Sequence, residues 1–336
     1  MKIIVSDNFV QNPLVSVVIP SYNRANTVSQ TIESILNQQC NFDFEIIVGD
    51  DCSTDNAREV LLAFQTQNPT KIKLLFYDKN IGIGASWATC VKQCRGKYIA
   101  NCDNDDYWHN LKKIQLQVDF LEKHLQFGLC HTDYRKHNRT TNKITEHTCE
   151  NILKEGDTLL QSLIRHHFVF CNASMLYRTS TLLQHVNMDD YIKHQFLLQD
   201  WNTWLLLAPF SEFACLHIST TTLGIETYSI TRPKNINALE ERWKKQKECY
   251  EYVREQLPEY YDYPYIEKEY DDYVNTACMD FSYETLDFRN AKKYASLLNS
   301  KSLRVRCAKN RLLFYPYAII SNLRRIYDSH SSFSPS

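Results

Sequence analysis

The chain has 336 residues, a formal net charge of −1 at pH 7, 43% hydrophobic residues and 23% charged residues. This length suits one large α/β domain, or one such domain with an appendage, and the near-zero charge excludes a strongly basic nucleic-acid-binding protein. The N-terminus lacks the apolar run of a signal peptide, and no stretch approaches the roughly 20 apolar residues of a membrane-spanning helix.

The twelve cysteines are scattered through the sequence, with no CxxC pair and no regular zinc-ligand spacing. In a chain of this length without a signal peptide, such scattered cysteines favour reduced thiols over a disulfide framework. We therefore expect a cytoplasmic protein.

The first 124 residues alternate short apolar runs with amphipathic stretches. This pattern predicts strands at 14–20, 44–51, 71–78 and 97–106, and helices at 27–39, 53–67, 84–95 and 111–124. Repeated β–α–β units of this length predict a mostly parallel, doubly wound α/β sheet of Rossmann-like type.

The regularity is weaker in the rest of the chain. The pattern predicts strands at 127–134, 172–177 and 213–218 and a helix at 200–208, and the last third is helical in character. We expect one catalytic domain over residues 14–230 and a C-terminal helical extension over residues 236–330.

Polar residues follow three of the predicted strands at their carboxyl ends. They are Pro20–Arg24 after the first strand, Asp50-Asp51 after the second, and Asp103–Asp106 after the fourth. Ligands of parallel α/β sheets bind outside the carboxyl ends of the strands. The sequence therefore predicts an acidic crevice at this edge, with an aromatic residue and an arginine beside it.

Crowded carboxylates repel one another, so they need a counter-charge or a shared proton. A hard divalent cation such as Mn²⁺ or Mg²⁺ meets that need, because it prefers oxygen ligands and bridges to phosphate. In an extended segment Asp103 and Asp105 point the same way. The alternative interpretation of this segment is a solvated turn, which is typical of Asp/Asn clusters.

Three segments carry a resemblance to a known family: VSVVIPSYNRANTVSQTIESILNQ with FEIIVGDDCSTDN, then NIGIGASWATCVKQCRGKYIANCDNDDYW, and then QDWNTWLLLA. Together they resemble the family 2 glycosyltransferases of the GT-A fold, the bacterial type that builds surface glycans. The resemblance spans roughly residues 14–210, with the segments in order. It implies an inverting transfer of a sugar from a nucleotide-sugar to an acceptor.

The resemblance also implies roles for residues that hold the donor. Pro20 and Tyr22 would line the nucleotide base, and Asp51 would accept a hydrogen bond from the base imide, which favours a UDP-sugar. Asp103 would lie near the ribose, and Asp105 would be the ligand of Mn²⁺ or Mg²⁺ in a DxD motif. The family makes no fixed use of Arg24, which we assign to the diphosphate.

Asp200 is the expected catalytic base. In the resembling segment an aspartate before a tryptophan takes the proton of the acceptor hydroxyl, and a carboxylate within about 2.6–3.2 Å of that hydroxyl suits this task. The alternative is that Asp200 only caps the helix that follows. Gln199 stands where the family often has an acid. The loop 223–231 keeps Ser229 but lacks the arginine and histidine that the family often shows there.

The C-terminal stretch 301–327 has an apolar middle flanked by arginines. Such a segment could rest on the inner membrane surface, where lipid-linked acceptors lie; a helix that covers the catalytic domain is the alternative. Pro316 argues against one uninterrupted helix.

The expected function is transfer of a sugar to a glycan or to a lipid-linked oligosaccharide during surface polysaccharide synthesis. Two other functions stay open. A nucleotidyltransferase shares a nucleotide-binding sheet and carboxylate-bound metal, but it normally has a glycine-rich and basic phosphate loop that PSYNRANT lacks. A non-catalytic nucleotide- or glycan-binding protein with the same fold is the second.

Overall fold

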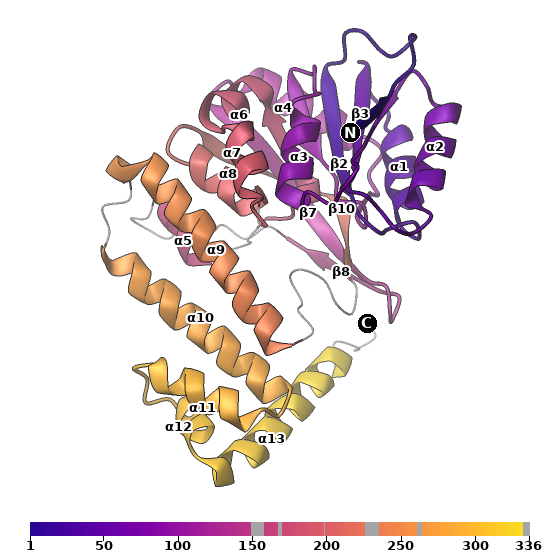
Figure 1. Cartoon of the computed structure of the whole chain (residues 1–336). Coiled ribbons are helices and arrows are strands. Elements are labelled where there is room, and N and C mark those ends of the chain that lie inside the picture. The colour runs from indigo at the N-terminus through magenta and orange to yellow at the C-terminus, as the bar shows by residue number, and fades with distance from the viewer. Residues whose placement is uncertain (149–157, 167–169, 198, 226–234, 261–263, 332–336) are drawn as a thin grey trace. The chain divides into compact units, whose positions relative to one another are not determined.

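A computed structural model describes residues 1–148, 158–166, 170–197, 199–225, 235–260 and 264–331 (Figure 1). Internal contacts divide the chain into two units. Unit 1 comprises residues 1–227 and 248–260, and unit 2 comprises residues 228–247 and 261–336.

Unit 1 is built on one sheet whose strand order is β1-β4-β3-β2-β5-β9-β7-β10-β6, with β8 paired to β7. Strands β4, β3, β2 and β5 are parallel to their neighbours in this order, and β7 and β10 also pair in parallel. The prediction of a mostly parallel α/β sheet is confirmed. The strand bounds are β1 (Lys2–Ile4), β2 (Val15–Ser21), β3 (Phe44–Asp50), β4 (Ile72–Phe76), β5 (Tyr98–Asn101), β6 (Tyr107–Trp108), β7 (Phe127–Asn138), β8 (Lys143–His147), β9 (Leu176–Arg178) and β10 (Glu212–Ile225).

Helices cover both faces of this sheet (Figure 1). Helices α1 and α2 contact each other, while α3 contacts α7 and α8 and packs on β2 and β3. The bounds in unit 1 are α1 (Val28–Leu36), α2 (Ala57–Gln67), α3 (Ile83–Val91), α4 (Lys113–Lys123), α5 (Leu159–His166), α6 (Thr179–His185), α7 (Met188–His194) and α8 (Gln199–Leu207).

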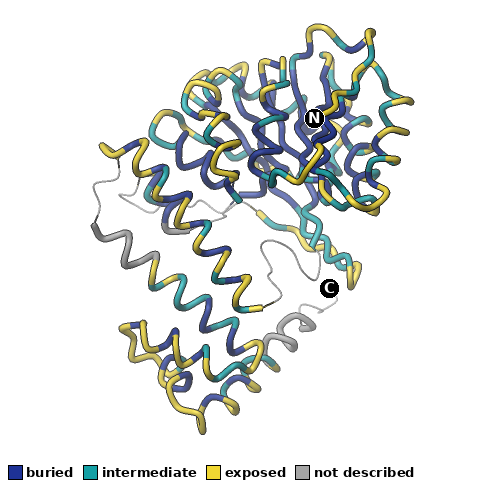
Figure 2. The backbone as a smooth tube through the Cα atoms, in the orientation of Figure 1, coloured by how far each residue is buried: buried dark blue, intermediate teal, exposed yellow. Residues whose placement is uncertain are grey.

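The central strands form because most of their side chains are apolar on both faces. Every residue of β2 and β3 is buried, as expected of strands between two helical layers. Figure 2 shows this buried centre in dark blue, with exposed residues on the outer helices. Strand β1 was not predicted. It is a short antiparallel edge strand whose residues Lys2 to Ile4 pair with Phe76 to Leu74.

The predicted strand 172–177 is wrong in its first half. Residues Asn172–Ser174 form a 3-10 turn, and the strand β9 begins only at Leu176. The turn is held by the Ser174 amide, which donates to the Cys171 carbonyl at 2.9 Å, and by the Met175 amide, which donates to the Asn172 carbonyl at 3.1 Å. Polar side chains at 172 and 174 thereby reach the interior of the unit, where both residues are buried.

Gly84 lies in the first turn of α3, where another segment approaches the helix very closely. A Cβ atom at this position would lie 2.1 Å from the Phe196 carbonyl oxygen. Because this neighbour is backbone, it can yield only if the segment after α7 moves. We expect Gly84→Ala to lower the free energy of unfolding by about 1–3 kcal/mol, measured by urea denaturation; an unchanged unfolding midpoint would contradict this close packing.

Unit 2 is helical in its described residues. It contains the first part of α9 (Ile236–Gln256), then α10 (Pro264–Glu284), α11 (Phe288–Leu297), α12 (Leu303–Lys309) and α13 (Arg311–Ser331). Its core includes Trp243, Met279, Tyr283 and Phe314, and the rings of Tyr283 and Phe314 stack with centroids 4.9 Å apart.

The C-terminal stretch is not one uninterrupted helix, as expected, but Pro316 is not the cause. The segment 301–327 is interrupted at Asn310, between α12 and α13, and Pro316 lies inside α13. A proline removes one backbone donor and crowds the carbonyl four residues earlier, which here is that of Leu312. Leu312 is 84% exposed, so its carbonyl can turn toward water. No helix among the residues placed by the structure is long and apolar enough to cross a membrane.

Candidate functional site

The order of the strands places the predicted crevice at a switch point. From β2 the chain builds outward through β3 and β4 on one side, and β5 then pairs with the other side of β2. Ligands of open α/β sheets bind at such a reversal, beyond the carboxyl ends of the strands. The segment Ser21–Arg24 begins at the end of β2, and the segment Asp103–Asp106 follows β5.

The loop that carries Asp103–Asp106 is held by three hydrogen bonds. Thr27 donates its hydroxyl to the Asn104 carbonyl at 2.8 Å, and Thr31 donates to the Asp106 carbonyl at 2.6 Å. The Asn104 amide donates to the Ser21 hydroxyl at 3.0 Å. Asn104 and Asp106 are 8% and 1% exposed. The alternative of a loose solvated turn does not describe this loop, because its backbone accepts hydrogen bonds from Thr27 and Thr31 and its Asn104 side chain is bound to Ser21 of β2.

Asp103, Asp105 and Asp200 lie close enough for their charges to interact. Burial, and next the charges of Asp105 and Asp200, raise the pKa of Asp103 to about 7. The Arg24 guanidinium pairs with the Asp105 carboxylate at 3.4 Å. The structure thus brings together four of the predicted residues, including Asp200, which is nearly a hundred positions away in the sequence.

A fourth carboxylate, Asp106, belongs to the same loop and is buried. Its Oδ1 accepts a hydrogen bond from the Gly224 amide at 2.8 Å, while Oδ2 is buried without a hydrogen-bond partner among the described residues. Burial, and next the charges of Asp105 and Asp103, raise its pKa. A Cβ atom on Gly224 would lie 2.2 Å from the Asp105 carbonyl oxygen, so only glycine lets β10 approach the loop this closely.

These oxygen donors fit a hard divalent cation. Asp103 and Asp105 are half-buried, and like charges lie beside them. Arg24 pairs with the Asp105 carboxylate, and Arg139 donates a hydrogen bond to the Asp105 carbonyl at 2.7 Å. An ion with oxygen preference would relieve that repulsion. The Asp105 carboxylate pairs with the Arg24 guanidinium, and its place as a metal ligand stays a prediction.

Sequence reasoning missed a buried amide relay behind Asp103. The Trp87 indole donates to the Asn101 amide oxygen at 3.0 Å, and the Asn101 amide donates to the Asn172 amide oxygen at 2.9 Å. The Asn172 amide then donates to both oxygens of Asp103 at 3.3 Å. Each amide is oriented by its neighbour, so the relay fixes the Asp103 carboxylate. No spacing in the sequence signals it, because Asn101 and Asn172 belong to different elements.

The raised pKa of Asp103 gives a prediction for stability. An aspartate whose folded pKa is about 7, against about 3.9 when unfolded, binds more protons in the folded state between these values, so stability falls as pH rises through this window. Asp103→Asn removes that cost. We expect the variant to unfold at higher urea than wild type at pH 8, with the gain shrinking toward pH 4. Asp43→Asn, at an exposed position, is the control, and an equal gain at both pH values would contradict the cause.

Asp200 lies in the first turn of α8, whose inner face is fixed by two tryptophans. The Asp200 Oδ1 accepts a hydrogen bond from the Trp201 amide at 2.7 Å. The Trp201 indole donates to the Leu163 carbonyl at 3.1 Å, and the Trp204 indole donates to the Tyr177 hydroxyl at 2.9 Å. Asp200 is half-buried, so its position combines a helix-terminal hydrogen bond with access to the cluster.

The residues predicted to line the base lie at the ends of β2 and β3. Pro20 is buried in β2 opposite Gly49, and Tyr22 is 45% exposed in the turn that follows. Asp51 is buried, with its two oxygens accepting hydrogen bonds from the Ile81 and Gly82 amides at 2.6 and 2.9 Å. Burial raises the pKa of Asp51. Ser229 lies outside the described residues.

Comparison with known proteins points to the family that the sequence motifs resemble. The sequence model of "Glycosyl transferase family 2" matches residues 16–184. The chain is 27% identical to the chondroitin synthase of Escherichia coli over 266 residues, which are 73% of this chain and 37% of that protein. It is 33% identical to the teichuronic acid biosynthesis glycosyltransferase TuaG of Bacillus subtilis over 109 residues, 32% of this chain and 42% of TuaG. The chain thus spans less than half of these curated relatives.

Solved structures share the fold. S. aureus TarS matches 94% of this chain and 55% of its own, with a TM-score of 0.52 and 16% identity. Its fragment 1-349 in complex with UDP-GlcNAc matches 95% of this chain and 91% of the fragment, with a TM-score of 0.51 and 17% identity.

Proposed function

Because the chain belongs to glycosyl transferase family 2, we propose that it transfers one sugar from a UDP-sugar to a glycan or lipid-linked oligosaccharide, with inversion at the anomeric carbon. The observation that carries this proposal is the cluster of Asp103, Asp105 and Asp200 at the switch point, where the Asp103 carboxylate interacts with both the predicted metal ligand Asp105 and the predicted base Asp200.

The donor would lie along the carboxyl ends of β2 and β5. The exposed ring of Tyr22 is available to stack on the base. The Asp51 carboxylate already holds two backbone amides, yet it has acceptor capacity left for a base imide. Asp103, oriented by Asn172, would bind the ribose. TarS, which shares the fold, has been solved in complex with UDP-GlcNAc, and a UDP-sugar is the donor class we propose here.

Asp105 would hold Mn²⁺ or Mg²⁺. When bound, such an ion supplies positive charge to the diphosphate as it leaves. Arg24, which pairs with Asp105 at 3.4 Å, would turn to the diphosphate once the cation takes its place beside the carboxylate. Both groups would then act on the leaving group, so no separate general acid is required.

Asp200 would take the proton of the acceptor hydroxyl. As the bond between the anomeric carbon and the diphosphate oxygen breaks, the acceptor oxygen forms its bond to the same carbon from the opposite face, and its proton passes to the carboxylate. The half-buried position of Asp200 at the start of a rigid helix suits a base that must meet its hydroxyl at a fixed distance. The Asp200 Oδ1 accepts the hydrogen bond from the Trp201 amide, and an ionised carboxylate offers about four acceptor positions in all.

We further propose that the enzyme works in the cytoplasm, at the inner membrane surface, with residues 14–230 as the catalytic domain and 236–330 as the helical extension. Helix α13 exposes Leu312, Ile319, Ile320 and Leu323, and Lys309 and Arg311 are exposed beside them. Apolar and basic side chains together favour an anionic lipid surface. Sedimentation with vesicles tests this contact. We expect the protein to sediment with anionic vesicles and not with neutral ones, and equal binding to both would contradict the proposal.

The donor class is tested by thermal unfolding of the pure protein with UDP, GDP, dTDP and CMP, each with and without Mn²⁺. A ligand at a hundred times its dissociation constant adds about 2.7 kcal/mol to the folded state. We expect stabilisation by UDP that requires the metal. Stabilisation by GDP and by no other nucleotide would contradict UDP-sugars as the donor class and favour GDP-sugars. No stabilisation by any nucleotide would favour a non-catalytic protein of this fold.

A nucleotidyltransferase is disfavoured by the loop after β2. Asn23 of this loop is hydrogen-bonded to the segment after β3. The Asn23 amide donates to the Ser53 hydroxyl at 3.0 Å, and the Thr54 amide donates to the Asn23 side chain at 2.7 Å. These bonds use groups that a phosphate-binding loop would present to its ligand.

A further inference from the structure

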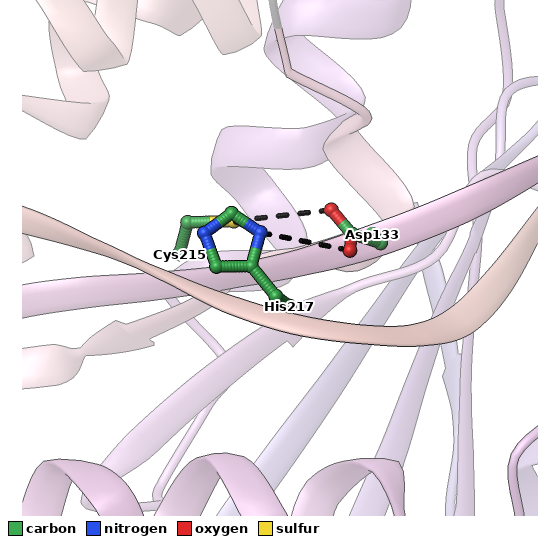
Figure 3. Close-up of side chains that lie close together, drawn as sticks. All are labelled: Asp133, Cys215 and His217. Carbon is green, nitrogen blue, oxygen red and sulfur yellow. Dashed lines mark hydrogen bonds and ion pairs between the residues drawn. The ribbon is translucent and has the colours of Figure 1, made fainter. Parts of the chain in front are cut away.

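A second group of metal-ligand side chains lies on β7 and β10, outside the aspartate cluster. Among the residues that the structure describes, Asp133, Cys215 and His217 form the one group of three whose ligand atoms all lie within 4.8 Å of one another. Figure 3 shows the Asp133 carboxylate facing both the thiol and the imidazole. We propose that these three residues bind one Zn²⁺ ion.

The strands bring the ligands to one face. Cys215 and His217 are two residues apart on β10, so their side chains lie on the same side. Cys215 pairs with His131 on β7, and Asp133 follows that residue by two positions, again on this side. The three ligands thus come from two adjacent parallel strands.

A bulge then aims the histidine. The register between the strands shifts after the pair Leu216 and Thr132, and Asp133 pairs with Ser219. Two extra residues of β10, His217 and Ile218, lie opposite this step. Bulges bend a strand and redirect a side chain, and here the imidazole Nδ1 reaches 3.7 Å from the Asp133 Oδ2.

The separations fit a tetrahedral zinc ion. The Cys215 Sγ lies 3.7 Å from the His217 Nδ1 and 4.0 Å from the Asp133 Oδ1. With bonds of about 2.3 Å to sulfur and about 2.0–2.2 Å to nitrogen and oxygen, a tetrahedral ion holds its ligand atoms about 3.3–3.6 Å apart. The sulfur and the imidazole face different oxygens of Asp133, and with one oxygen as the ligand the three atoms lie within 4.8 Å of one another. A closing movement of up to roughly an ångström therefore brings them to the tetrahedral spacing.

The ligand chemistry selects the metal. A thiolate, an imidazole and a carboxylate together suit zinc, whereas Mn²⁺ and Mg²⁺ prefer the all-oxygen donors of the Asp103–Asp105 loop. The Asp133 side chain is 9% exposed and that of His217 is 69% exposed. One ligand is thus anchored in the unit, and the site opens to solvent on the histidine side, where the ion enters and the fourth position lies.

The site is distinct from the predicted donor metal but shares its edge of the sheet. Ala100 of β5 and Cys130 of β7 both pair with Leu176 of β9. Asp103 and Asp133 each follow three residues later. Two strand spacings, roughly 10 Å, therefore separate the two carboxylates in the direction across the sheet. Zinc at this place would join β7 to β10 beside the donor crevice.

The test uses the full chain, freed of metal and titrated with Zn²⁺ and with Co²⁺ as the spectroscopic probe. We expect one ion per chain, a thiolate-to-cobalt charge-transfer band, and a rise of roughly 5–10 °C in Tm with Zn²⁺ at a hundred times its dissociation constant. Cys215→Ser should abolish the band, and His217→Gln, at an exposed position, should weaken binding without harm to the fold.

Controls separate this site from others. Cys40→Ser, at a half-buried cysteine elsewhere, should keep the band, and Asp105→Ala should keep it while changing only the Mn²⁺ response of nucleotide binding. No bound zinc in folded wild-type protein overturns the proposal, and so does zinc binding that is unchanged in both Cys215→Ser and His217→Gln. Neither result bears on the proposed glycosyl transfer.

Discussion

Replacing Asp200 by asparagine is expected to lower kcat by about 10²- to 10⁴-fold, the range for loss of a general base. Asparagine caps a helix as well as aspartate does, so its amide oxygen can still accept the hydrogen bond from Trp201 that the carboxylate accepts at 2.7 Å. Fold and donor binding should therefore remain, and only proton removal should fail. Release of UDP from the donor in the presence of acceptor measures the rate.

A matched control is available on the neighbouring helix. Asp189 also lies in the first turn of a helix, α7, where it is exposed and pairs with Lys92 at 2.6 Å. Asp189→Asn should leave the rate within about twofold of wild type, as is usual for exposed substitutions. If both variants keep full activity, Asp200 is a helix cap and the base lies elsewhere.

Asp105→Ala is expected to remove the metal dependence of nucleotide binding. The Asp105 carboxylate pairs with Arg24 at 3.4 Å and adds to the repulsion that raises the pKa of Asp103. Without it the divalent ion loses the ligand that the sequence predicts. The variant should lose the roughly 2.7 kcal/mol that UDP with Mn²⁺ contributes at a hundred times the dissociation constant.

The comparison that decides this prediction is the response to Mn²⁺, measured as the shift in Tm with UDP present. Wild type should respond and the variant should not, whereas Asp43→Asn, at an exposed position, should respond like wild type. A variant that still requires Mn²⁺ for UDP binding would place the metal on other ligands, with Asp103 the first to test.

Much of the fold could be predicted because the first half of unit 1 follows simple periodicities. The strands β2 to β5 and the helices α1 to α4 lie where apolar runs and amphipathic stretches predict them. The edge strand β1 was not predicted, and the strand predicted at 213–218 covers only the first half of β10, since the pairing of both strands depends on partners far away in the sequence. The domain boundaries at 14–230 and 236–330 stay predictions.

The candidate site was predictable where its residues follow strands. Asp103 and Asp105 come directly after β5, and the parallel sheet brings them to the edge that Arg24 reaches. The supporting groups were not predictable. Asn172 contacts Asp103 from 69 positions away, through a 3-10 turn that reads as strand in the sequence. The Asp133, Cys215 and His217 group depends on a register shift that no local pattern reveals.

The most direct test of the proposed glycosyl transfer is a proton NMR time course of a UDP-sugar incubated with the protein and Mn²⁺. In the absence of acceptor, water takes the place of the acceptor hydroxyl, and the free sugar is observed as it forms. We predict loss of the donor, appearance of UDP, and first appearance of the anomer opposite to that of the donor. First appearance of the same anomer would contradict inversion by Asp200, and an intact donor, with acceptors also supplied, would contradict transfer from UDP-sugars.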